Sequence, residues 1–297
     1  MTSNDGYIGR NQNGSGTVNV SGSGSAWVNG GMLRVGDVSG RGVLNIGAGG
    51  LVSNTDSFVG SVGGSGDVVV SGAGATWNNA GAMNLGFGLG AGAGTLTIAD
   101  GGSVNVGVGG NGTVSLVNGA IFPFGGSGTL NIGAPVSEPA AGAGTLNAAA
   151  LEFGAGRATL NFNHTDTAYR FATRLSSVGS GIHGLNQVAG TTLLTGANGA
   201  FLGKTTVSGG RLVVLGQLGG AAEVTGGTLQ YGDGGVGAAN RVAADLKVSG
   251  AGSTLALRGP ATLAVSGNST WRTTRCWTSW RARTCRCAPT SSRSAPT

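Results

Sequence analysis

The residues of this chain that could form a hydrolytic site are close together in one segment. His164 and Asp166 are two positions apart, so they would share one face if that stretch is a β-strand. Ser176 or Ser177 follows nearby and would complete the residue types of a serine–histidine–aspartate triad. No Gly-x-Ser-x-Gly turn accompanies them to expose a nucleophile. We therefore interpret the group as a polar patch on an irregular segment.

Two glycine motifs resemble ligand sites but lack the features that such sites need. Residues 107–112 match Gly-x-Gly-x-x-Gly, yet no helical pattern follows to bind a dinucleotide phosphate. The stretch from Gly63 to Asp67 resembles a calcium-binding nonapeptide, but its aspartate comes one position early and does not recur. We interpret both as turns of a glycine-rich chain, and we expect no cofactor.

Metal binding by cysteine is not expected either. The three cysteines are Cys276, Cys285 and Cys287, and no fourth ligand accompanies them. Neither His164 nor His183 stands at zinc-finger spacing from them. We therefore expect no metal site.

A carbohydrate-cleaving site would need clustered carboxylates on one sheet. The three glutamates, Glu138, Glu152 and Glu223, are far apart in sequence, although stacked coils could bring distant residues together. Trp27 and Trp77 could serve as platforms for sugar rings, but we interpret them as core aromatic residues.

A short repeated phrase organises residues 1–270. The chain has 63 glycines among 297 residues, and Gly-x-Gly recurs at residues 14, 40, 64, 92, 110, 126 and 142. Apolar and polar residues alternate after each Gly-x-Gly. In residues 17–20, for example, Val18 and Val20 would face one side of a strand. A unit this short cannot bury its own apolar face, so copies must stack on one another. The pattern predicts an all-β fold, a β-solenoid.

A longer period indicates how the coils are built. Residues 21–36 and 71–86 carry nearly the same phrase, and Trp27 and Trp77 within them are 50 residues apart. We expect this 50-residue unit to form two or three coils. Stacked coils place equivalent residues about 4.8 Å apart, so asparagine and threonine should form hydrogen-bonded ladders.

We divide the chain into four parts. Residues 1–160 form the Gly-x-Gly solenoid, residues 161–200 an irregular linking segment, and residues 201–269 a second solenoid with a changed phrase. Residues 270–297 lack Gly, Asp, Glu, Leu, Val and Ile but hold all three cysteines and six arginines. We expect this tail to be disordered. Its composition is typical of a GC-rich reading frame shifted by one base, and we take the tail as an out-of-frame product.

Charge argues against a nucleic-acid partner, and hydropathy argues against a transmembrane helix. The net charge of +6 arises in the tail, because residues 1–270 carry 11 basic and 11 acidic residues. A neutral body offers no broad surface for a polyanion, so we expect no nucleic-acid partner. No window approaches 18 unbroken apolar residues, so we expect no transmembrane helix. Residues 1–5 also lack the features of a secretory signal, and we expect the chain to be an interior fragment of a longer precursor.

The phrase FLGKTTVSGGRLVVLGQLGG, which begins at residue 201, resembles the passenger-associated transport repeat of autotransporters, the type V secreted proteins of Gram-negative bacteria. The positions typical of that repeat are occupied by Phe201, Gly203, Thr205, Val207, Gly210 and Leu212. The resemblance implies a right-handed parallel β-helix, exported through its own C-terminal translocator barrel with the outer-membrane assembly machinery as partner. It also implies a location at the cell surface or outside the cell for the full-length parent.

From these features we expect a non-enzymatic passenger fragment, a stalk or adhesin-like β-helix whose stacking assists export. Two alternatives stay open: a polysaccharide-cleaving enzyme on a β-helix scaffold, and a truncated gene product without function. The sequence names no host or cell-surface ligand.

Overall fold

The computed structural model describes residues 1–88, 90–118, 126–233, 240–242, 244–258, 263–272, 283–286 and 292–293. Throughout these residues the chain is all-β, and parallel strands joined by short turns form a β-solenoid, as predicted. The one helical element among the described residues is a 3₁₀ turn, Val108–Gly110. These residues contain no helix whose length and apolar character would let it cross a membrane. Most of the tail that we expected to be disordered, 270–297, lies outside the described residues.

The chain divides into two compact units. The first contains Met1–His164 and Ser176–His183, and the second contains Thr165–Leu175 and Gly184–Thr297. Two of the three boundaries fall within strands, β20 (Arg174–Ser177) and β21 (Ile182–Ala189), and the third follows His164.

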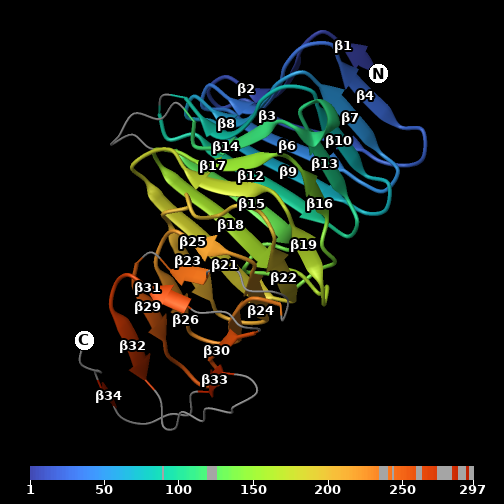
Figure 1. Cartoon of the computed structure of the whole chain (residues 1–297). Coiled ribbons are helices and arrows are strands. Elements are labelled where there is room, and N and C mark those ends of the chain that lie inside the picture. The colour runs from blue at the N-terminus through green and yellow to red at the C-terminus, as the bar shows by residue number, and fades with distance from the viewer. Residues whose placement is uncertain are drawn as a thin grey trace. The chain divides into compact units, whose positions relative to one another are not determined.

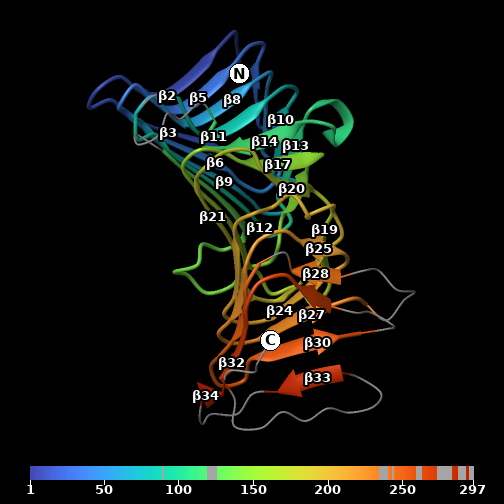
Figure 2. The same cartoon turned by 60° about the vertical axis from the view of Figure 1, so that its left-hand side comes forward.

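Three parallel sheets form the first unit, and each coil contributes one strand to each sheet (Figures 1 and 2). Sheet A contains β1 (Thr2–Ser3), β4 (Ala26–Asn29), β7 (Leu51–Asn54), β10 (Thr76–Asn79), β13 (Ser103–Val106) and β16 (Thr145–Asn147). Sheet B contains β2 (Gly6–Arg10), β5 (Leu33–Asp37), β8 (Ser57–Ser61), β11 (Met83–Phe87), β14 (Thr113–Leu116), β17 (Ala150–Phe153) and β20. The strands of sheet C that belong to the first unit are β3 (Ser15–Val20), β6 (Arg41–Ile46), β9 (Ser65–Ser71), β12 (Ala93–Ala99), β15 (Ser127–Gly133) and β18 (Arg157–Asn163).

Strand register gives the length of each coil. Along sheet C the directly opposed residues are Val18, Leu44, Val68, Leu96, Leu130 and Leu160, so successive coils differ by 26, 24, 28, 34 and 30 residues. Trp27 and Trp77 are both opposite Val52, so the 50-residue repeat is two coils. The Gly-x-Gly phrases at 110 and 142 precede strands of sheets B and A instead of starting a further coil in sheet C.

Glycine is required where sheet B meets sheet C, because two backbones touch there. Gly36 lies near the end of β5 with φ +70°, and a Cβ on it would lie 1.9 Å from the Ser65 carbonyl oxygen of the next coil. A Cβ on Gly66 would lie 2.1 Å from the Val35 carbonyl oxygen. Neither position can hold a side chain without moving a backbone. This contact explains the second glycine of the repeated phrase.

The interior is filled by the apolar half of each strand. In β6, Leu44 and Ile46 are buried while the alternate residues are half-buried or exposed, and the same alternation recurs in the neighbouring strands. Trp27 is 5% exposed and Trp77 is 0% exposed, which confirms that both are core residues. These side chains lose nearly all contact with water, the main favourable term in folding.

Asparagine ladders run along the coils, as the repeat predicted. On the surface of sheet A, Asn147 donates to Asn105 at 2.6 Å and Asn105 donates to Asn78 at 2.7 Å. A second set is internal: the Asn54 amide donates to Asn79 Oδ1 at 2.7 Å, and Asn54 Oδ1 accepts from the Trp77 indole N–H at 2.7 Å. The internal set satisfies the polar edge of a buried tryptophan.

The second unit is built from three ladders of strands. One contains β21, β23 (Lys204–Val207), β26 (Ala222–Val224), β29 (Leu246–Val248), β32 (Ser269–Arg272) and the antiparallel β34 (Ser292–Arg293). Another contains β19 (Tyr169–Phe171), β22 (Thr191–Leu194), β24 (Arg211–Val214), β27 (Thr228–Tyr231), β30 (Thr254–Leu257) and the antiparallel β33 (Arg283–Arg286). The third contains β25 (Gln217–Leu218), β28 (Asn240–Val242) and β31 (Leu263–Val265). Opposed residues Thr205, Ala222, Leu246 and Ser269 give coils of 17, 24 and 23 residues.

Replacing Asn54 by alanine should destabilise the protein by about 2–3 kcal/mol, because the buried Trp77 N–H loses its acceptor and Asn79 Oδ1 loses one of its two donors. The matched control is Asn45→Ala, which removes a surface-ladder bond of 2.7 Å to Asn19 and should cost about 0.5 kcal/mol or less. Urea denaturation followed by circular dichroism measures both. Equal effects of the two substitutions would contradict the structural role assigned to the internal ladder.

Candidate functional site

One ladder on sheet B carries side chains of unusually varied chemistry. In successive coils the directly opposed residues are Tyr7, Arg34, Phe58, Asn84, Ser115 and Glu152. Each is followed by an apolar residue that faces the interior, such as Val59 after Phe58. The ladder therefore lies on the outer face of sheet B, and register alone places its members side by side.

Part of this ladder forms the floor of a groove of about 640 Å³. Phe58, Asn84, Ser115 and Glu152 all line it. One wall is made of residues without large side chains, among them Ala80, Gly81, Gly107 and Gly112, and the groove is also lined by Phe87 and Asn118. The volume is within the usual range for small-molecule sites.

Aromatic and amide groups are held in place inside the groove. The rings of Phe58 and Phe87 meet edge to face, with centroids 4.8 Å apart and an interplanar angle of 63°. The Asn118 amide donates to Asn84 Oδ1 at 3.0 Å, which fixes the orientation of both amides. Both rings are half-buried, so each keeps part of its surface open.

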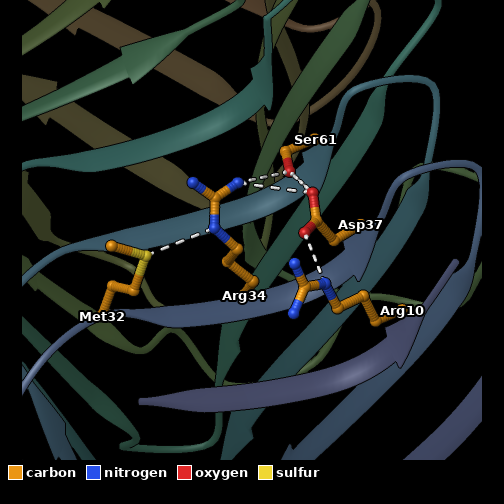
Figure 3. A network of polar contacts seen from close by, with 5 residues as sticks. All are labelled: Arg10, Met32, Arg34, Asp37 and Ser61. Carbon is orange, nitrogen blue, oxygen red and sulfur yellow. Dashed lines mark hydrogen bonds and ion pairs between the residues drawn. The ribbon is translucent and has the colours of Figure 1, made fainter. Parts of the chain in front are cut away.

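A polar network around Asp37 lies beside Phe58, and Figure 3 shows its members Arg10, Arg34, Asp37 and Ser61. Asp37 is 3% exposed, and its carboxylate accepts from Arg34 Nη1 at 3.3 Å and from the Ser61 hydroxyl. Arg10 Nε lies 3.8 Å from the other carboxylate oxygen. The Arg34 guanidinium stacks over the Phe58 ring, 4.4 Å from its centroid. The network therefore holds a cation against the face of Phe58.

The residues considered and set aside as a hydrolytic triad have different surroundings. His164 is fully buried in the first unit and lies edge-on to Phe162, with ring centroids 6.4 Å apart. Asp166 belongs to the second unit, and Ser176 is 6% exposed.

Ser177 is hydrogen-bonded to His183 instead, a pairing that the sequence did not suggest. Its hydroxyl lies 2.9 Å from His183 Nδ1, and His183 Nε2 lies 2.7 Å from the Gly154 carbonyl oxygen. A carbonyl only accepts, so Nε2 carries the proton and the Ser177 hydroxyl donates to Nδ1.

The glycine and cysteine motifs are placed as follows. Residues 107–112 contain the 3₁₀ turn and lead into strand β14. The side chain of Asp67 is 41% exposed, and its carboxylate lies 3.8 Å from Arg41. Cys285 lies in β33, whereas Cys276 and Cys287 lie outside the described residues. Within the described ranges, no three His, Cys, Asp or Glu side chains are grouped to hold a metal ion.

The three glutamates have separate environments. Glu152 lines the groove, and Glu138 is an exposed loop residue of the first unit. Glu223, in the second unit, accepts from Lys204 and lies 2.7 Å from Lys247. The hydrogen bonds from these two lysines lower the pKa of Glu223.

Sequence reasoning missed the groove, although a signal for it was present. Tyr7, Arg34, Phe58, Asn84 and Glu152 each stand two residues before a glycine, with one apolar residue between. Aligning the coils on that glycine instead of on Gly-x-Gly would have brought these residues into one column.

Replacing Asp37 by alanine should destabilise the protein by about 2 kcal/mol, because Arg34 and Ser61 lose a buried acceptor. The matched control is Asp67→Ala, which breaks an exposed pair with Arg41 and should cost under about 0.5 kcal/mol. Thermal and urea denaturation of both variants measure the difference. A fully stable Asp37→Ala protein would show that the network around Asp37 does not stabilise the fold.

Comparison with known proteins identified no relative of this chain. No family model, no curated protein and no solved structure matches the chain. The groove and the coils are therefore interpreted from their own geometry.

Proposed function

We propose that this chain is the passenger stalk of an autotransporter, a non-enzymatic β-helix at the surface of a Gram-negative cell or released from it. The observation that carries the proposal is the transport-repeat phrase, whose residues have packing roles within a coil of the second unit. The parallel solenoid is compatible with such a passenger.

The phrase builds one coil. Phe201, Val207 and Leu212 are each 0% exposed, and Thr205 is 2% exposed. Gly203 is buried as well, and Gly210 has φ +57°, with space for a Cβ blocked by the Gly190 carbonyl oxygen at 2.3 Å. The buried residues of the phrase thus fill the interior of the coil, and Gly210 forms one turn of the chain.

Such coils would assist export by folding in order. Strands of successive coils pair in parallel, as β26 pairs with β23 of the coil before it and β27 with β24. Burying one aliphatic side chain contributes about 1.5–3 kcal/mol, so each coil that stacks outside the cell opposes backward movement of the chain. The partners in this scheme are a translocator barrel and the outer-membrane assembly machinery.

Polysaccharide cleavage is a second candidate, and one observation favours it. Glu152 lines the groove and presents a carboxylate next to Ser115, its neighbour in the ladder. A hydrolase of the common type needs two carboxyl groups across the bond that it cleaves. Turnover of a polysaccharide that Glu152→Gln abolishes would favour this candidate over the stalk.

The export proposal is tested by placing the full chain between a secretory signal and a translocator barrel in a Gram-negative host. We expect the chain to reach the surface, where added protease detects it. Val207→Asp should lower the amount at the surface several-fold, because an unpaired charge would enter the coil interior. Leu202→Asp is the control, since Leu202 is 67% exposed. Failure of the unmodified chain to reach the surface, or equal display of both variants, would contradict the proposal.

A further inference from the structure

The strongest unassigned feature of the first unit is the groove on sheet B, and its occupant can be argued from its lining. Its floor is a straight row in which Phe58, Asn84, Ser115 and Glu152 stand on adjacent strands. Adjacent strands are about 4.8 Å apart, so the row extends over roughly 14 Å along the coil axis. A ligand that follows this row must be elongated, with groups that match an aromatic ring, an amide, a hydroxyl and a carboxylate in turn.

The lining combines flat apolar surface with neutral hydrogen-bonding groups. Phe58 and Phe87 are half-buried and offer partly open ring surface. The bond between Asn118 and Asn84 uses the Asn84 carbonyl oxygen, so the Asn84 amide nitrogen and the Asn118 carbonyl oxygen can face a ligand. A pyranose ring has the matching surfaces, an apolar face of C–H groups and a rim of hydroxyl groups that both donate and accept.

The wall of small residues permits close approach of such a ring. Gly81 packs closely on the preceding coil, because a Cβ on it would lie 2.4 Å from the Asp56 carboxylate. That carboxylate accepts from the Ala82 backbone N–H at 2.7 Å. These contacts fix this edge of the groove to the preceding coil.

Charge narrows the class of ligand. Among the described residues that line the groove, Glu152 is the one with an ionisable side chain. Arg34, the nearest cation along the ladder, is engaged by Asp37 and by the Phe58 ring. A polyanion would meet a carboxylate without a free cation opposite it, so the lining favours an uncharged ligand.

We infer that the groove on sheet B binds a neutral oligosaccharide chain, laid along the coil axis with one ring packed against the exposed part of the Phe58–Phe87 pair and hydroxyl groups bonded to Asn84, Asn118 and Glu152. The inference is independent of how the chain is exported. It assigns recognition to the groove and no chemical step.

The test is calorimetric titration of the full chain with maltohexaose, cellohexaose, mannohexaose and chitohexaose, and with a heparin hexasaccharide as the anionic comparison. At least one neutral hexasaccharide should bind at one site per chain, with heparin weaker. Phe58→Ala should lower the affinity about tenfold or more, since a stacked aromatic residue commonly dominates such a site. Tyr7→Ala is the matched control, because Tyr7 belongs to the same ladder but lies outside the groove.

A second variant keeps the test valid if Phe58→Ala does not fold. Ser115→Trp fills the groove floor from outside the core and should abolish binding while the circular dichroism spectrum is unchanged. Absence of binding by all four neutral sugars, stronger binding of heparin, or equal loss in Tyr7→Ala would overturn the inference. Undiminished binding by Ser115→Trp would overturn it as well.

Discussion

Where sheet B ends and sheet C begins, the backbones of adjacent coils touch with no side chain between them. The Ser65 carbonyl oxygen occupies the space that a Cβ on Gly36 would need, and the Val35 carbonyl oxygen occupies that of Gly66. Equivalent contacts recur at Gly60 and Gly94, and again at Gly9 with Gly42. Close approach at this corner fixes how each coil rests on the next. The high glycine content is thus a packing requirement and not a sign of disorder.

Constant register follows from that corner, and the surface features follow from the register. Equivalent residues of each coil become direct neighbours, so one type of side chain repeated along the sequence becomes a ladder in space. The asparagines of sheet A use this to hydrogen-bond to one another. On sheet B the equivalent positions vary from coil to coil, and the same register produces a mixed row of aromatic, amide and carboxylate groups. The groove lies where that row is flanked by small residues.

The sequence predicted much of this fold, because the fold is periodic. Alternation in residues 17–20 identified the interior face. The 50-residue spacing of Trp27 and Trp77 predicted two or three coils, and the structure has two. The groove on sheet B was harder to predict from the sequence. Phe58, Asn84 and Glu152 are not near one another in sequence, and they share no residue type that a motif could capture. Ser177 and His183 were both visible, but their pairing depends on how the chain turns between residues 177 and 183.

The central claim, that backbone contact at the corner determines the fold, is best tested by the unfolding free energies of four glycine-to-alanine variants. Gly36→Ala combines a positive φ with a blocked Cβ, and Gly66→Ala has the blocked Cβ alone. Gly24→Ala has only the positive φ, +83°, and Gly30→Ala has neither, its nearest atom being 3.9 Å away. The account predicts losses of about 3 kcal/mol or more for Gly36 and Gly66, about 1 kcal/mol for Gly24, and almost none for Gly30. A Gly66→Ala protein as stable as Gly30→Ala would contradict it.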